Sequence, residues 1–100
     1  MREKLPKIRC RVENLYNKNQ FVIFTNVNKK EYIIFQSYSS EIAIYHINGD
    51  LYINDKYINY SKTTSKHLYL FINDYTRFSC HNLPELKQLI KEGSIKTYTR

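Results

Sequence analysis

The chain has 100 residues, enough for one domain with a buried core that needs no disulfide or metal ion. Hydrophobic residues make up 42% of it, which excludes a disordered chain, and no apolar run approaches the ~20 residues that span a bilayer. The net charge of +7 favours polyanionic partners, although codons rich in A and T also encode Lys, Asn, Ile and Tyr and explain part of the lysine excess equally well.

Residues 1–11 are predicted to form a basic N-terminal arm, which contains five cationic residues and a single acidic residue, Glu3. The cations are Arg2, Lys4, Lys7, Arg9 and Arg11. Pro6 blocks a regular helix, so we expect an arm that binds nucleic acid or a partner and joins an edge strand from Ile8 onward. The alternative is a solvated, frayed terminus. No apolar segment of a secretory signal follows the arm, so we expect a cytoplasmic protein.

Four segments rich in β-branched and aromatic residues predict the strands of an antiparallel sheet. They are residues 21–27, 32–38, 42–47 and 51–53. Asn48-Gly49 lies between the last two and indicates a β-hairpin with a type I′ turn, because that turn needs a positive φ at both central residues. Strict alternation along this hairpin predicts Ile42 and Ile44 on one face and Ala43 on the other.

Two amphipathic segments, at about 61–74 and 83–92, predict helices. Their apolar stripes are Leu68, Phe71, Ile72 and Tyr75 in the first, and Leu83, Leu86, Leu89 and Ile90 in the second. Ser61 and Asn82 are the expected N-caps, and Gly93 suits the position after the second helix. The order predicts a single α+β domain over residues 1–100, with an antiparallel sheet of four to five strands packed on one face by two helices.

Two further segments have extended character. Residues 76–80 are predicted as a short strand or a connection, and residues 94–100 as an edge strand or a tail.

The spacing of reactive residues matches no known catalytic or metal-binding pattern. Cys10 and Cys80 are isolated in the sequence, so we expect free thiols in a reducing compartment. Cys80 with His67 or His46 is the candidate for a hidden nucleophile, with Cys80 and His67 the first residues to substitute, against the alternative of inert packing. Gly49 and Gly93 are both needed for turns, which leaves no glycine-rich phosphate loop. We therefore expect no enzyme, no metal and no cofactor.

Aromatic and basic residues cluster around the start of the first helix. The candidates for nucleic-acid or partner binding there are Tyr38, Tyr57, Tyr60, Lys62 and Lys66. Tyrosines beside lysines stack bases and neutralise phosphate. The hydroxyl residues Ser61, Thr63 and Thr64 predict an anion-binding helix start. The plainer alternatives are half-buried sheet tyrosines, solvated lysines and a simple helix cap.

Two stretches resemble a family of small uncharacterised proteins of phages and mobile elements of low-GC Gram-positive bacteria. They are Phe35–Ala43 (FQSYSSEIA) and Tyr57–Ile72 (YINYSKTTSKHLYLFI), and together they cover about a quarter of the chain. The family pattern has an aromatic residue and an acid before its Tyr-Ser, where this chain has Ile58 and Asn59, so the role of that acid does not carry over. The resemblance implies a phage context and no enzyme chemistry.

The resemblance, the small size and the positive charge together predict a function in binding. We expect a non-enzymatic phage accessory protein that binds and inhibits a host defence nucleoprotein or nuclease, in the manner of an anti-CRISPR protein. The alternative is a small DNA- or RNA-binding protein that regulates phage genes. The sequence leaves the oligomeric state open.

Overall fold

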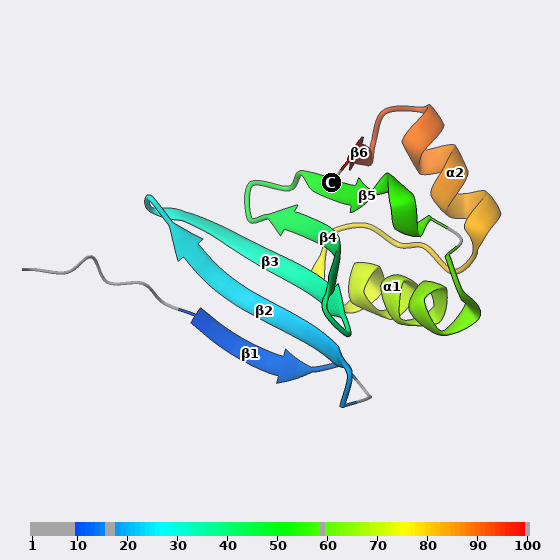
Figure 1. Ribbon diagram of the computed structural model, residues 1–100. Helices are drawn as coiled ribbons and strands as arrows, with labels where there is room; N and C mark the ends of the chain where they lie inside the picture. Colours follow the sequence, from blue (N-terminus) through cyan, green and yellow to red (C-terminus); the bar gives the residue numbers. More distant parts are fainter. Residues whose placement is uncertain (1–9, 16–17, 59, 100) are drawn as a thin grey trace, which may run out of the picture.

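The computed structural model describes residues 10–15, 18–58 and 60–99, and has an α+β architecture (Figure 1). The strands are β1 (Cys10–Asn14), β2 (Gln20–Val27), β3 (Lys30–Ser37), β4 (Ser40–His46), β5 (Leu51–Asn54) and β6 (Lys96–Tyr98), and the helices are α1 (Lys62–Tyr75), α2 (Leu83–Lys91) and the short 3₁₀ helix η1 (Asp55–Tyr57). Among the described residues, neither α-helix has the length and hydrophobicity needed to cross a membrane.

The six strands form one open sheet whose spatial order is the order of the chain. Strands β1 to β5 pair antiparallel, each with the next, whereas β6 returns after both helices and pairs parallel with β5. The predicted α+β fold with two helices is confirmed. The sixth strand comes from residues 94–100, and residues 76–80 form an irregular connection.

The turns differ from the prediction in one respect. A β4–β5 hairpin does surround Asn48-Gly49, but only Gly49 of this pair has a positive φ, of 110°. The Asn48 side chain accepts a hydrogen bond from the Asp50 N–H at 3.0 Å, which stabilises a longer turn. The two-residue turn with positive φ at both positions lies instead at Asn28 and Lys29, between β2 and β3.

Strand β4 also departs from strict alternation. Its register against β3 shifts between Phe35 and Gln36, so that one residue of β4 is inserted without a partner. As a result Ile42 and Ala43, which were predicted on opposite faces, are both 0% exposed. The bulge restores the alternation one residue later, where Ile44 is half-buried on the opposite face.

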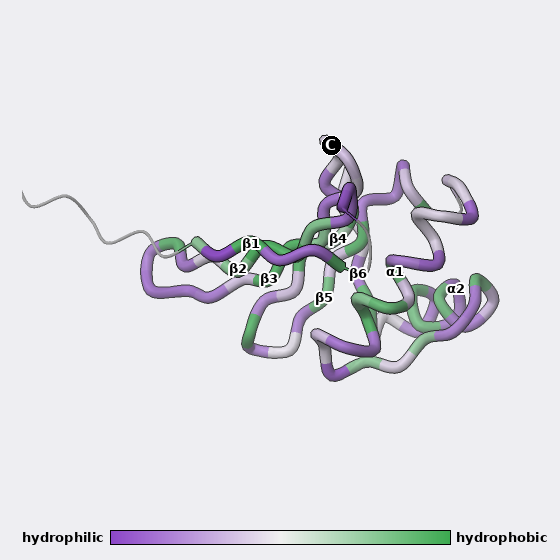
Figure 2. The backbone as a smooth tube through the Cα atoms, turned by 90° about the horizontal axis from the view of Figure 1, so that it is seen from below, coloured by the Kyte–Doolittle hydropathy of each residue, from purple (hydrophilic) through white to green (hydrophobic). Residues whose placement is uncertain are grey.

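Helix α1 covers one face of the sheet and forms the core with it. The Phe71 ring stacks on Phe35 of β3 with centroids 5.6 Å apart, and Tyr75 meets Phe24 of β2 edge to face at 5.8 Å. The predicted stripe of α1 is confirmed, because Leu68, Phe71 and Ile72 are buried. Figure 2 shows hydrophobic segments along the strands of the sheet.

The helix ends agree with the predicted signals. The side-chain oxygen of Ser61 accepts from the Thr64 N–H at 3.1 Å, and that of Asn82 accepts from the Glu85 N–H at 2.9 Å. Gly93 follows α2 with a φ of 82°. These caps fix where each helix begins and therefore which side chains surround its first turn.

Candidate binding site

The two stretches singled out in the sequence meet at one hollow of about 440 Å³ on the surface. The hydroxyl pocket, as we name it, is lined by Ser37, Tyr38, Ser40, Ile42, Tyr57, Tyr60, Ser61, Thr63 and Thr64. The β3–β4 turn supplies its first side, and the segment from η1 to the first turn of α1 supplies the other. Residues at least fifteen positions apart in the chain thus share one small surface.

Hydrogen bonds between hydroxyl groups hold the two sides of the pocket together. Ser37 Oγ and Thr64 Oγ1 lie 3.5 Å apart, and both residues are buried. The Tyr57 hydroxyl donates to Ser40 Oγ at 3.1 Å. The Ser61 hydroxyl caps α1. Most of the pocket's hydroxyl groups are therefore already oriented by the fold, as a recognition surface requires.

Two tyrosines stand exposed at the pocket. Tyr38 is 62% exposed and Tyr60 is 67% exposed. Tyr60 meets Tyr57 edge to face, with centroids 5.1 Å apart. Tyr38 has a φ of 54°, a left-handed conformation that costs a bulky L-residue free energy. Tyr38 N–H donates to the Asn19 carbonyl at 2.7 Å, which fixes this conformation.

The predicted cations lie elsewhere. Lys62 and Lys66 are exposed and line a second hollow, on the outer side of α1, where neither forms an ion pair among the described residues. Arg11 lies on β1, with its guanidinium 4.4 Å from the Phe24 ring centroid and its Nε 3.4 Å from the Glu13 carboxylate. The remaining predicted cations of the arm, Arg2, Lys4, Lys7 and Arg9, lie outside the described residues. The described structure therefore groups the tyrosines with the hydroxyl residues and separates them from Arg11 and both lysines.

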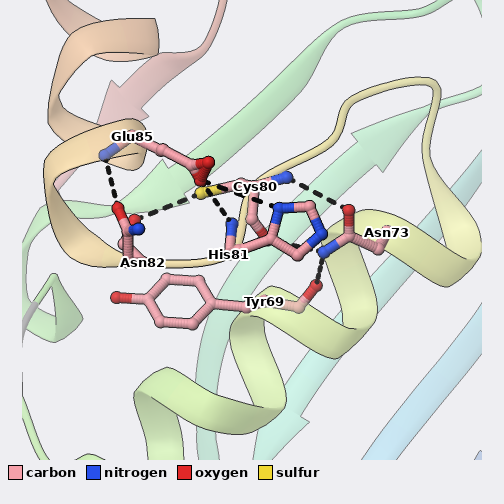
Figure 3. Close-up of polar contacts among 6 residues, drawn as sticks. All are labelled: Tyr69, Asn73, Cys80, His81, Asn82 and Glu85. Atoms are coloured by element: carbon pink, nitrogen blue, oxygen red, sulfur yellow. Dashed lines mark hydrogen bonds and ion pairs between the residues drawn. The ribbon is translucent and has the colours of Figure 1, made fainter.

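The second hollow, of about 480 Å³, lies where the α1–α2 connection packs against α1 (Figure 3). Asn73 braces the connection: its Nδ2 donates to the carbonyl oxygens of Tyr69 and Cys80, and its Oδ1 accepts from the Cys80 N–H at 3.1 Å. Sequence reasoning missed Asn73. The available signal was an Asn inside a helical pattern, where this residue type is unfavourable unless its side chain has a use.

The Cys80 thiol and the His67 imidazole each lie against a backbone carbonyl group of the fold. Cys80 is buried and its Sγ donates to the Asn82 carbonyl at 3.5 Å, while burial raises the pKa of the Cys80 thiol and so disfavours the thiolate. His67 Nδ1 lies 2.8 Å from the Thr63 carbonyl oxygen of its own helix. Among the described residues, no group of three or more His, Cys, Asp or Glu side chains has the arrangement of a metal site.

Comparison with known proteins gives one match. Residues 4–83 match the family model described as a family of unknown function (DUF8033), which spans most of the described sheet and all of α1. Neither the curated proteins nor the solved structures compared with the chain contain a significant match.

Proposed function

Because the chain belongs to the DUF8033 family of unknown function, its function is argued from its geometry, and we propose that it acts by binding through the hydroxyl pocket. We propose that the partner is a nucleoprotein or nuclease of a host defence system, which the bound protein inhibits by covering its surface. Tyrosine is among the residues that dominate binding free energy at protein interfaces, because its ring supplies contact area and its hydroxyl a hydrogen bond.

Tyr38 is the observation that carries this proposal. Its backbone is in a left-handed conformation, and its ring is mostly exposed. Glycine at this turn position avoids the backbone cost, and an exposed ring returns little packing free energy to the fold. A residue that strains the backbone while its side chain faces solvent is best explained by contacts with a partner.

The partner class is supported by where the two phage-like stretches meet. Ser37 to Ile42 from the first stretch and Tyr57 to Thr64 from the second supply the whole lining of the hydroxyl pocket. Their shared surface is therefore where we propose the partner contact.

The test is affinity capture from bacterial cells that carry a defence nuclease complex, using the tagged protein with and without nuclease treatment of the lysate. We expect stoichiometric capture of a protein complex that survives the treatment. Tyr38→Ala and Tyr60→Ala should each abolish capture. Ile47→Ala is the matched control, because Ile47 is 56% exposed but lies in the β4–β5 turn, away from the pocket. Equal capture by all three variants contradicts the proposal.

A second candidate function is nucleic-acid binding, and the exposed pair Lys62 and Lys66 favours it. The two lysines lie one helical turn apart on the outer side of α1, and like charges at this spacing slightly destabilise the helix. If they neutralise phosphates, affinity for single-stranded DNA or RNA falls with salt, and the double variant Lys62→Ala/Lys66→Ala reduces the slope of log K against log salt by about 1 to 2. A gel shift that does not respond to salt counts against this function.

A further inference from the structure

The sheet has a second face, opposite α1, whose central row of side chains is apolar. Side chains alternate along a strand, so residues next to the buried Val22 and Phe35 point away from the helix. The open face, as we name it, carries the apolar or aromatic side chains Val12, Phe21, Ile23, Tyr32, Ile34, Ile44 and Tyr52, and beside them Cys10, Asn14, Thr25, Gln36, Glu41 and His46, all half-buried or exposed.

One register row crosses this face from edge to edge. The paired residues along it are Val12, Ile23, Ile34, Ile44, Tyr52 and Lys96, one from each strand from β1 to β6. The first five are apolar or aromatic, and the only charge in the row is at its far end, where Lys96 Nζ lies 3.7 Å from Asp50. An antiparallel sheet that faces water normally carries polar residues at such positions.

The size of the face reaches the lower end of the range for protein interfaces. The six strands are separated by five spacings of ~4.8 Å, which make the face roughly 24 Å wide. The average length of the six strands makes the face about 20 Å long. The flat projection is therefore about 500 Å², of the order of the ~800 Å² of accessible surface that each partner contributes to a standard interface.

The chemistry of the face favours protein over nucleic acid. Bases stack on open aromatic rings, but Tyr32 already stacks on His46 with centroids 4.9 Å apart, and Lys96 Nζ lies 5.6 Å from the Tyr52 ring centroid. The centre of the row consists of isoleucines, which offer no π surface. Branched aliphatic side chains in neighbouring strands are instead what two packed sheets bury between them.

We propose that the open face packs against the open face of a second copy, giving a symmetric dimer with two sheets face to face. A two-fold interface brings the same patch of both copies together, which suits a face with almost no charge at its centre. The positive charges on the other surfaces of the two copies repel each other. Salt screens this repulsion, because the Debye length is ≈ 10 Å at 0.1 M. This inference does not depend on the hydroxyl pocket.

The experiment is sedimentation equilibrium of the purified chain at about 0.1 M and about 1 M salt, where the Debye length falls from ≈ 10 to ≈ 3 Å. We expect a dimer that tightens with salt, because screening weakens the repulsion between two chains of charge +7. Affinity for nucleic acid falls as the salt concentration rises, which is the opposite of the expected dimer. A chain that is monomeric at both salt concentrations but binds single-stranded nucleic acid at low salt overturns the proposal. A chain that is monomeric at both salts without such binding also overturns it.

Single substitutions test whether the dimer interface lies on the open face. Ile34→Lys, at the centre of the row, should raise the dimer dissociation constant about 30-fold or more, as expected for a central interface residue. Ile47→Lys adds the same charge at an exposed isoleucine outside the open face and should leave the dimer unchanged. Thr25→Lys, at a polar and half-buried position of the face, is the second variant if Ile34→Lys unfolds. Equal dissociation constants for the face variants and Ile47→Lys overturn the proposal.

Discussion

Replacing Tyr38 by glycine and, separately, by alanine measures the backbone strain at this residue. Both variants remove the ring, so the difference between them reports only the backbone. A left-handed conformation costs an L-residue about 1–2 kcal/mol, and glycine loses about 0.5–1 kcal/mol more conformational entropy on folding than alanine. Tyr38→Gly should therefore be more stable than Tyr38→Ala by about 0.5–1 kcal/mol.

Thermal and urea unfolding of the two variants measure this difference. For a domain of this size, 1 kcal/mol corresponds to ≈ 4–8 °C in Tm, so the glycine variant should melt roughly 2–8 °C above the alanine variant. The turn itself should persist in both, because the Tyr38 backbone hydrogen bonds, to the Asn19 carbonyl and from Gln36 Nε2 at 2.8 Å, do not use the ring.

The neighbouring residue gives the control. Ser39 lies in the same turn without a positive φ, so the usual order applies there and Ser39→Ala should be more stable than Ser39→Gly by about 0.5–1 kcal/mol. The predicted sign thus reverses between two consecutive residues. If Tyr38→Ala equals or exceeds Tyr38→Gly in stability, the backbone at Tyr38 carries no cost and the argument for its use in binding fails.

Three further predictions concern buried or capping groups. The Gln20 side chain is fully buried and neither its amide nitrogen nor its oxygen has a partner among the described residues, so Gln20→Leu should raise the free energy of unfolding by about 1–3 kcal/mol in urea titrations, and a loss of stability would contradict this reading. Ser61→Ala removes the cap on the Thr64 N–H and should cost about 1 kcal/mol, whereas Ser61→Asp, which keeps a cap oxygen, should cost little. Burial raises the pKa of the Cys80 thiol, so the unfolded chain loses its thiol proton first, and stability should fall as pH rises above ~8.5; this part of the pH dependence should be absent in Cys80→Ala.

Local signals in the sequence were enough for the helices. The side chains of Ser61 and Asn82 cap backbone N–H groups three residues away, and Gly93 allows the positive φ after α2, so these residues alone predict where the helices begin and where α2 ends. The β3–β4 bulge has no such signal, because it depends on how two strands align. The burial of both Ile42 and Ala43 follows from that alignment and could not be read from alternation.

The candidate site was predictable in part. Helical geometry already separates Lys62 and Lys66 from Thr64, because two residues along a helix turn by about 200° and place side chains on opposite sides. Since the apolar stripe places Thr64 toward the core, the sequence alone is enough to direct both lysines outward. The contact of Ser37 with Thr64 is different in kind, because it depends on how the β3–β4 turn docks against α1. The bracing role of Asn73 likewise depends on the path of the connection after α1.

The parallel pairing of β6 with β5 has a consequence for the chain as it leaves the ribosome. About 40 residues separate the two strands, which at typical synthesis rates of 5–20 residues per second leaves a nascent sheet with β5 at its border for roughly 2–8 s. During this time the backbone groups on the outer side of β5 are open to strands of neighbouring nascent chains. Strand β6 then covers them, and the Tyr98 hydroxyl donates to the Glu41 carboxylate at 2.8 Å, which fastens β6 to β4 as well. A strand translated only after both helices therefore replaces β5 at the border of the sheet with a three-residue edge, which offers fewer open backbone groups to another chain.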